Sequence, residues 1–207
     1  MTDTRRRRAP AMEPDERRAA IVDATLPLLV EHGAAVTTGQ IATAAGVAEG
    51  TVFRAFVDRH ELLWACLDAA VDPAQPVAAL AEIPRNLPLS ERLHRACGAV
   101  AEHWDRAMQV GHAVCTACAR PPADAATHRG PQGLAEGARA LHEALADLLA
   151  PDADRLRLGA HRTARLFLVT VMGNEMTRMR LAMLGAETPG DTEDLIDVFL
   201  HGAVVQP

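Results

Sequence analysis

Residues 37–63, TTGQIATAAGVAEGTVFRAFVDRHELL, decide the fold of this chain. Thr37 and Gln40 have the spacing of a capping box, in which the hydroxyl and the amide side chain satisfy unpaired backbone groups at the start of a helix. Gly46 lies where that helix has to end, because glycine enters the left-handed conformation at little cost. A second short helix then starts near Ala48. The stretch therefore predicts a helix-turn-helix, whose second helix fits the major groove of DNA.

The same stretch resembles the DNA-binding core of the TetR family of bacterial regulators. That family follows roughly the pattern T-T-x-x-I-A-x-x-A-G-V-S-x-G-T-[LV]-[YF]-x-[HY]-F-x-x-K-x-x-L. The residues that match it, in order and at the family's spacing, are Thr37, Thr38, Ile41, Ala42, Ala45, Gly46, Val47, Gly50, Thr51, Val52, Phe53, Phe56 and Leu62. The alternative is an incidental helical hairpin inside an all-helical core. The resemblance implies a transcription regulator, but its motif covers only the N-terminal part of the chain.

Composition favours helices along the whole chain. Aromatic residues make up 3% of the sequence and tyrosine is absent, whereas strands are enriched in aromatic and β-branched residues. We expect an all-α fold, with an N-terminal three-helix helix-turn-helix domain and a C-terminal helical domain for ligand binding and dimerisation, as the resemblance implies. The expected division is a flexible, arginine-rich arm at 1–13, a DNA-binding domain at 14–58 and an effector-binding and dimerisation domain at 59–207.

Apolar stripes of helical period and helix-breaking residues give the remaining elements. Pro27 is expected to bend the first helix without ending it, and Ser90 to cap a long one. The predicted helices outside the helix-turn-helix are 14–32, a helix opening at 59, 77–83, 90–119, 134–149, about 151–184 and 192–204, with a loop at 120–133.

The net charge of −6 is unevenly distributed. Residues 1–60 hold eight arginines and eight acidic residues, so the remainder of the chain carries the whole negative excess. The proposed DNA-facing end is therefore less strongly repelled by phosphate than the rest. Arg5 to Arg8 form the only dense positive run, which is either an arm lying on phosphates or in the minor groove, or a solvated tail.

Nine residues around the turn are expected to meet DNA: Thr37, Thr38, Ala48, Glu49, Gly50, Thr51, Phe53, Arg54 and Arg59. The resemblance implies backbone contacts for several of them. Phe53 replaces the commoner tyrosine and loses its hydroxyl, while Arg59 replaces a lysine, and either cation serves a phosphate. Gly39 offers no side chain for reading bases, Glu49 can accept from a cytosine amino group, and Ala55 replaces a histidine or tyrosine that could contact phosphate. The operator sequence is therefore not deducible, and a helical small-molecule-binding protein that has lost or altered DNA binding is the alternative.

The last two predicted helices resemble the dimerisation helices of the family. A symmetric homodimer reads two half-sites, so the expected partner is double-stranded DNA with a pseudo-palindromic operator. The alternative is that these helices close a monomeric core. The interface residues predicted on them are Leu166, Gly173, Leu195, Phe199 and Gly202.

Bulky apolar and sulfur-containing side chains suit an adaptable pocket between the long helices. The residues predicted to line it are Trp104, Met108, Cys115, Phe167, Met172 and Met176. Ordinary core packing is the alternative for any one of them. The effector, a small and largely apolar molecule, cannot be identified from the sequence. We expect it to release a repressor from its operator, although an activator is also compatible with these residues.

Cys115 and Cys118 form a C-x-x-C, with His112 three residues earlier. This spacing is compatible with a thiol or metal sensor, but no second C-x-x-C completes a zinc set, so we predict no metal and no cofactor. The four irregularly spaced cysteines suit a reducing cytoplasm. No apolar run approaches the roughly 18 residues of a membrane span. No nucleophile triad or phosphate-binding loop is present, so we expect no enzyme.

Overall fold

The computed structural model describes residues 13–118, 131–186 and 192–203, and within these ranges it contains helices and no strand, so the predicted all-α fold is confirmed. The first helix, α1 (Pro14–His32), continues through Pro27 and ends at Gly33, whose φ is 57°. The helices that follow are α2 (Thr38–Ala44), α3 (Glu49–Ala55), α4 (Arg59–Ala70), α5 (Ala74–Glu82), α6 (Leu89–Ala117), α7 (Pro131–Leu149), α8 (Gly159–Met183) and α9 (Thr192–Ala203).

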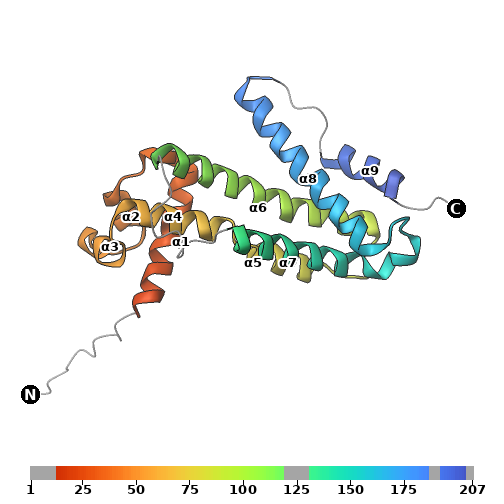
Figure 1. Cartoon of the computed structure of the whole chain (residues 1–207), viewed down its shortest axis with the longest axis horizontal. Helices are drawn as coiled ribbons and strands as arrows, with labels where there is room; N and C mark the ends of the chain where they lie inside the picture. The colour runs from red at the N-terminus through yellow and green to blue at the C-terminus, as the bar shows by residue number, and fades with distance from the viewer. Residues whose placement is uncertain (1–12, 119–130, 187–191, 204–207) are drawn as a thin grey trace, which may run out of the picture.

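The helices form two groups, and α6 runs through both (Figure 1). Helices α1 to α4 gather at one end and bury an N-terminal core that includes Ile21, Leu29, Ile41, Val52, Phe56, Leu62, Leu63 and Cys66. Helices α5, α7, α8 and α9 pack with the first half of α6 around a C-terminal core that includes Leu80, Leu93, Val100, Leu145, Leu148, Phe167, Val171 and Ile196. The second half of α6 closes the N-terminal core through Val110, Ala113, Val114 and Cys118. One continuous helix therefore links the two cores.

The helix predicted at about 151–184 is wrong in detail. The helix predicted from Pro151 is divided: Ala150–Arg155 is a short 3-10 helix, and α8 begins only at Gly159. Between them, Leu156 is extended and buried, and Gly159 has a φ of 67°. Burying Leu156 in the C-terminal core thus interrupts the helix, and glycine supplies the left-handed step that restarts it.

The two helices on either side of the predicted loop also begin earlier than expected. Helix α7 starts at Pro131, so the predicted loop at 120–133 overlaps it, while 119–130 lies outside the described residues. Ser90 does not cap α6, because the N-cap position is Pro88 and no side-chain cap is made. The arginine-rich arm predicted at 1–13 lies outside the described residues except for Glu13.

A buried arginine joins the elements of the C-terminal group. Arg92 on α6 has only 2% of its surface exposed. It donates hydrogen bonds to the carbonyl oxygens of Leu87, at 3.1 Å, and Leu148, and it pairs with the carboxylate of Asp152. A buried guanidinium is tolerated only with such partners, so this set ties α6 to the end of α7 and to the 3-10 helix.

No helix among the described residues is both long and apolar enough to cross a membrane.

Candidate DNA-binding surface and ligand cavity

The turn between α2 and α3 is closed by short-range hydrogen bonds. Thr37 Oγ1 accepts from the Gln40 N–H at 3.2 Å, and Gln40 Oε1 accepts from the Thr37 N–H at 2.8 Å, which completes the predicted capping box. Gly46, with a φ of 65°, donates to the Thr43 carbonyl, and the Val47 N–H donates to the Ala42 carbonyl at 3.0 Å. This pair of bonds is a Schellman motif, which requires the left-handed residue that the sequence supplies.

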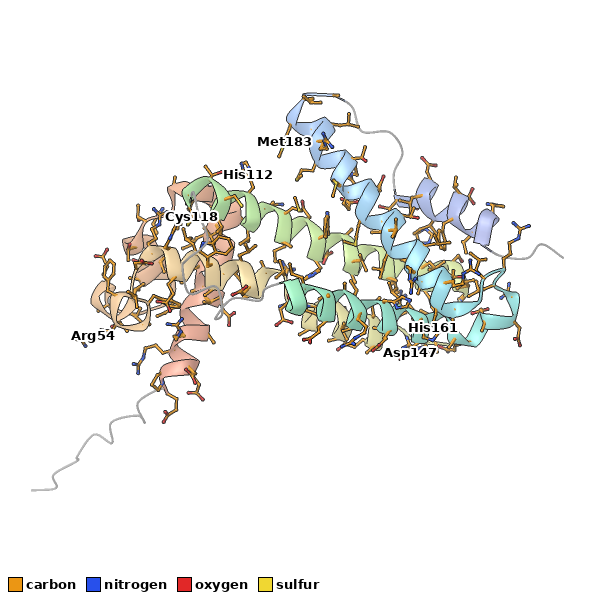
Figure 2. All side chains as sticks on the ribbon, viewed as in Figure 1. Arg54, His112, Cys118, Asp147, His161 and Met183 are labelled. Carbon is orange, nitrogen blue, oxygen red and sulfur yellow. The ribbon has the colours of Figure 1, made fainter. Side chains whose placement is uncertain are left out.

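One face of helix α3 packs on the N-terminal core, and the opposite face is exposed to solvent. Val52 and Phe56 are buried in the N-terminal core at 3% and 2% exposure, whereas Phe53 is 55% exposed. Ala48, Glu49, Gly50 and Arg54 are also exposed, and Thr51 is half-buried. Helix α3 lies at one extremity of the molecule (Figure 1), and Arg54 extends away from the ribbon (Figure 2). The residues predicted to meet DNA on α3 therefore share an outward face.

An arginine that sequence reasoning missed holds α3 in place. Arg18 on α1 donates to the Ala55 carbonyl at the end of α3, pairs with Glu61 Oε1 at 2.7 Å, and lies over the Phe56 ring at 4.2 Å from its centroid. Glu61 Oε2 accepts from the Val57 N–H at 2.6 Å. We call Arg18, Ala55, Phe56, Val57 and Glu61 the arginine clamp. The available signal was Arg18 lying one helical turn before buried Ile21, on the apolar face of α1.

The clamp also changes the acidity of its carboxylate. Burial raises the pKa of Glu61, but the hydrogen bond from Val57 and the nearby Arg18 guanidinium outweigh it, so that the pKa lies below its ordinary value. Glu61 is thus ionised at neutral pH and keeps Arg18 directed toward the end of α3.

Arg59 has two backbone partners that were not predicted. Its Nη2 donates to the carbonyl oxygens of Ala34 and Val36, at 2.8 and 2.9 Å, so it anchors the segment before α2. The side chain remains exposed, and a guanidinium has five N–H donors, so these two bonds leave donors for a phosphate. Contact with DNA stays a prediction for Arg59. Two of the residues predicted to meet DNA directly follow the segment that Arg59 anchors. Thr37 is exposed, and Thr38 is half-buried at the start of α2.

A polar groove of about 380 Å³ lies between the start of α1 and α3. Its lining residues are Pro14, Arg17, Arg18, Thr51, Arg54 and Ala55. Arginines from two helices therefore converge beside the exposed face of α3, although the N-terminal segment has no net positive charge. Sequence reasoning identified Arg54 and Thr51 but not Arg17, which is distant from them in the chain.

A second hollow, of about 460 Å³, lies where the two groups of helices meet; we call it the apolar cavity. It is lined by Leu67 and Val71 at the end of α4, Pro73, and residues of α6, α7 and α8, namely Val100, His103, Trp104, Ala107, Met108, Gly111, Leu134, Gly137, Ala138, Leu141, Leu168 and Met172. Trp104, Met108 and Met172 were predicted here. Phe167 is instead fully buried in the C-terminal core, and Met176 and Cys115 are exposed and do not line the apolar cavity.

Among the described residues that line the apolar cavity, His103 alone has a titratable side chain. Burial lowers its pKa, Arg106 lowers it further, and Asp72 acts in the opposite direction. The imidazole is therefore neutral at pH 7. The contribution of α4 to the apolar cavity was not foreseen either, because Leu67 is part of an ordinary apolar stripe.

The four cysteines differ in their exposure to solvent. Cys66, Cys97 and Cys118 are buried, and burial raises the pKa of each thiol, to about 12 for Cys66 and about 11 for Cys97. Cys115 is exposed. No group of three metal-binding side chains occurs among the described residues.

The predicted interface residues fall into two groups. On α8, Leu166 is exposed and a side chain at Gly173 would meet nothing within 4 Å; Val169 and Met176, which were not predicted for the interface, are exposed on the same helix. On α9, Leu195 and Phe199 pack against the C-terminal core of their own subunit, with the Phe199 ring 5.3 Å from that of Phe167.

The predicted residues of α9 are less accessible than those of α8 because they cover the C-terminal core of their own subunit. Val198, at 72% exposure, is the outward apolar residue of α9. The Gly202 carbonyl accepts a long bond from Arg157, at 3.4 Å. An intersubunit role for Leu195, Phe199 and Gly202 stays a prediction.

Comparisons with known proteins agree with this geometry. Residues 21–66 match the family model described as "Bacterial regulatory proteins, tetR family". No curated protein matches the chain. Among solved structures, the TetR transcriptional regulator SCO0520 of Streptomyces coelicolor is 21% identical, with 92% of this chain and 99% of that chain covered at a TM-score of 0.61.

Two further structures have the same fold. NalD of Pseudomonas aeruginosa, described as the secondary repressor of the MexAB-OprM multidrug efflux pump, is 20% identical, with 93% and 98% of the two chains covered and a TM-score of 0.53. A transcriptional regulator from Rhodococcus sp. is 24% identical, with 95% and 100% covered and a TM-score of 0.51.

Fold and site together define an all-helical protein with a helix-turn-helix at one end. The predicted resemblance is confirmed: the helix-turn-helix segment is that of the TetR family, and the whole chain has the fold of TetR-family transcriptional regulators.

Proposed function

We propose that the chain is a homodimeric transcriptional repressor that binds a pseudo-palindromic operator and is released by a small apolar effector. The observation that supports DNA binding is that α3 has one buried face and one exposed face. Val52 and Phe56 anchor it, while Glu49, Gly50, Phe53 and Arg54 are presented to solvent. A helix held in this way can enter the major groove without losing its packing.

Phosphate contacts would come from the flanks of α3. Arg17 and Arg54 line the polar groove, and Arg59 remains exposed while it anchors the segment before α2. Such contacts give affinity and register but little sequence information. The proposed division is an arm at 1–13, a DNA-binding domain at 14–58 and a second domain at 59–207, with α4 packing on the N-terminal core and bordering the apolar cavity. A regulator of this kind acts on the bacterial chromosome, so we place it in the cytoplasm.

Dimerisation is proposed through the exposed side of α8. Leu166, Val169, Gly173 and Met176 recur at spacings of three and four, which places them on one face of the helix. Apolar residues in a continuous exposed stripe are characteristic of an interaction surface. Gly173 would permit close approach of a second helix, and Val198 of α9 would extend the stripe. A twofold axis along this face would present two copies of α3 to successive half-sites.

Effector release is proposed to act through α4. This helix has 12 residues and is about 18 Å long. Leu67 and Val71 border the apolar cavity at one end, and Arg59 holds the segment before α2 at the other. An effector that fits the apolar cavity only when α4 is displaced would favour the displaced state by its difference in affinity between the states. NalD is described as a repressor, which supports repression over activation.

The test of DNA binding is a gel shift with the DNA upstream of the gene. The variant is Arg54→Ala, which removes an exposed cation from α3, and the matched control is Arg95→Ala on α6, whose side chain is also exposed. We expect Arg54→Ala to weaken binding by at least about fivefold, within the range for one phosphate or base contact, with an unchanged melting temperature. The control should bind like the wild type.

The alternative function, a helical binder without DNA activity, is favoured if the wild-type protein shifts neither upstream nor random DNA at low salt. This alternative rests on Gly39, Glu49 and Ala55, which give the DNA-facing surface few side chains for contacting bases or phosphates. Equal losses in Arg54→Ala and Arg95→Ala would contradict the proposed placement of α3.

A further inference from the structure

The C-x-x-C pair lies at the end of α6, where one thiol is exposed and the other is buried. Cys115 belongs to the last turn of the helix and is the only exposed one of the chain's four cysteines, all of which the structure describes. Cys118 is the residue at which α6 ends, and its side chain is 5% exposed within the N-terminal core. Because thiol oxidation follows exposure, an oxidant in solution reaches Cys115 first.

The two side chains are close enough to form a disulfide only after a small movement. Residues three positions apart on a helix have Cβ atoms about 5–6 Å apart, whereas a disulfide requires about 3.5–4.5 Å. The end of α6 must therefore shift by about 1–2 Å for the bond to close. Cys115 is inside the helix, while Cys118 follows its last residue and is tied to it by the bond from its N–H to the Val114 carbonyl, at 2.8 Å. Cys118 is thus the residue that moves.

The place that Cys118 occupies supports the start of the helix-turn-helix. Helix α6 packs against Gly33–Ala35, a short 3-10 helix in the segment that Arg59 anchors. Burial raises the pKa of the Cys118 thiol above its ordinary value, and the nearby charges of Arg59 and Asp58 act on it in opposite directions. The thiol therefore lies where the end of α6 and the start of α4 meet this segment, at the side of the molecule that holds the N-terminal helices (Figure 2).

We propose that Cys115 and Cys118 are a dithiol that hydroperoxides oxidise to a disulfide, and that closing the bond draws Cys118 out of the N-terminal core. In the first step the Cys115 thiolate attacks the O–O bond, which breaks; the sulfur becomes a sulfenic acid and the second oxygen leaves as water or an alcohol after protonation. In the second step the Cys118 sulfur displaces the sulfenic hydroxyl, so that the S–S bond forms and its proton leaves with the hydroxyl as water. The thiols lose two electrons and the peroxide gains them.

The disulfide is also expected to weaken DNA binding, and this part of the inference rests on the proposed function. The segment that contacts the end of α6 leads directly to Thr37, the N-cap of α2. Loosening it would leave α2 and α3 less firmly placed on the N-terminal core. Oxidation and DNA release would then be coupled through the two states of the end of α6.

The experiment treats the reduced full-length protein with equimolar and then excess hydrogen peroxide, alkylates the remaining thiols and digests the chain with trypsin. Both cysteines fall on one peptide, residues 107–129, because Arg120 precedes a proline and is not cleaved. The disulfide form of this peptide is lighter by two hydrogen atoms and takes up no alkylating agent. The variants are Cys115→Ser and Cys118→Ala, and the matched control is Cys97→Ala, which removes a buried thiol from the C-terminal core.

We expect the wild-type peptide to convert to the disulfide form, with a fall in melting temperature of about 2–4 °C, as for a small side chain leaving a core in a chain of this size. Affinity for the upstream DNA should fall by about fivefold or more, and dithiothreitol should restore both values. Cys97→Ala should respond like the wild type. Cys115→Ser and Cys118→Ala should lose the response, and the exposed position of Cys115 keeps its variant folded.

Several outcomes would overturn the proposal. Full alkylation of both thiols after excess peroxide, conversion of Cys115 to a sulfinic acid, or a bond between the Cys115 residues of two copies on a non-reducing gel would each eliminate the internal disulfide. An internal disulfide with unchanged melting temperature and DNA affinity would contradict the withdrawal of Cys118 from the core. If the reduced wild type shifts no DNA, the proposed function fails, while the peptide and the melting temperature still decide on the disulfide and on what it displaces.

Discussion

Removing the arginine clamp should release α3 from the rest of the N-terminal core. In Arg18→Met the side chain keeps its length and apolar stem but loses its hydrogen bond to the Ala55 carbonyl, its ion pair with Glu61 and its position over Phe56. We expect a thermodynamic cost together with a loss of DNA affinity, since α3 then keeps its packing through Val52 and Phe56 but loses the side chain that ties it to α1.

The size of the effect follows from the three contacts. The hydrogen bond contributes about 1 kcal/mol. The ion pair is partly exposed, with side-chain exposures of 36% for Arg18 and 30% for Glu61, so its contribution is discounted to below about 1 kcal/mol. The cation–π contact adds about 0.5 kcal/mol at such a site. Together they give about 2 kcal/mol, or a fall in melting temperature of roughly 4–8 °C for a chain of this size.

The assay is thermal unfolding combined with operator titration, with Arg95→Met as the matched control. Arg95 forms an exposed pair with Glu91 on α6, at 2.9 Å, and its replacement should cost no more than about 0.5 kcal/mol. If Arg18→Met unfolds no more easily than Arg95→Met, the arginine clamp does not hold α3. Coupling to Glu61 is measured with Glu61→Gln, because the double variant should lose less than the sum of the single losses.

Four further results are expected. Gly46→Ala should destabilise the fold by about 1–2 kcal/mol, because its φ of 65° is strained for any residue with a Cβ although no atom obstructs one, whereas Gly39→Ala in α2 should be neutral or stabilising by chemical denaturation. Arg59→Ala should weaken operator and random DNA alike and reduce the salt slope by about one, and an unchanged slope would remove Arg59 from the phosphate contacts. The lowered pKa of Glu61 means that its stabilisation is complete above the ordinary glutamate range and is lost as the pH falls through the lowered value, so Glu61→Gln should flatten the acid side of the stability profile. Val169→Glu should yield monomers in sedimentation at an unchanged melting temperature of the subunit, and a variant that still sediments as a dimer would place the interface elsewhere.

The structure also changes one earlier expectation about the interface. Phe199 was predicted to be an intersubunit contact, which a charged substitution at that position would test. Because its ring packs on Phe167 in the same subunit, Phe199→Glu would damage the C-terminal core and separate the subunits only indirectly. Val169 on α8 is the better position, since it is exposed and belongs to no core.

The sequence by itself determined the helix-turn-helix and the all-helical class. Thr37, Gln40 and Gly46 act on backbone groups only a few positions away, so their hydrogen bonds are encoded locally and can be predicted without the fold. The apolar periodicity likewise indicated most of the helices. It failed at Leu156, where burial in a distant core interrupts a segment that has helical spacing on both sides.

Tertiary structure alone decided which residues share a site. Arg18 reaches Ala55 and Glu61 across 37 and 43 positions of the chain. The apolar cavity is lined by residues of α4, α6, α7 and α8. Of the six residues predicted to line it, three do so: Trp104, Met108 and Met172. A stripe of apolar residues on a helix looks the same in the sequence whether it faces a dry core, a cavity or a second subunit. Only the packing of the other helices against that stripe distinguishes these cases, because burial depends on all the surrounding elements and not on the spacing within one of them.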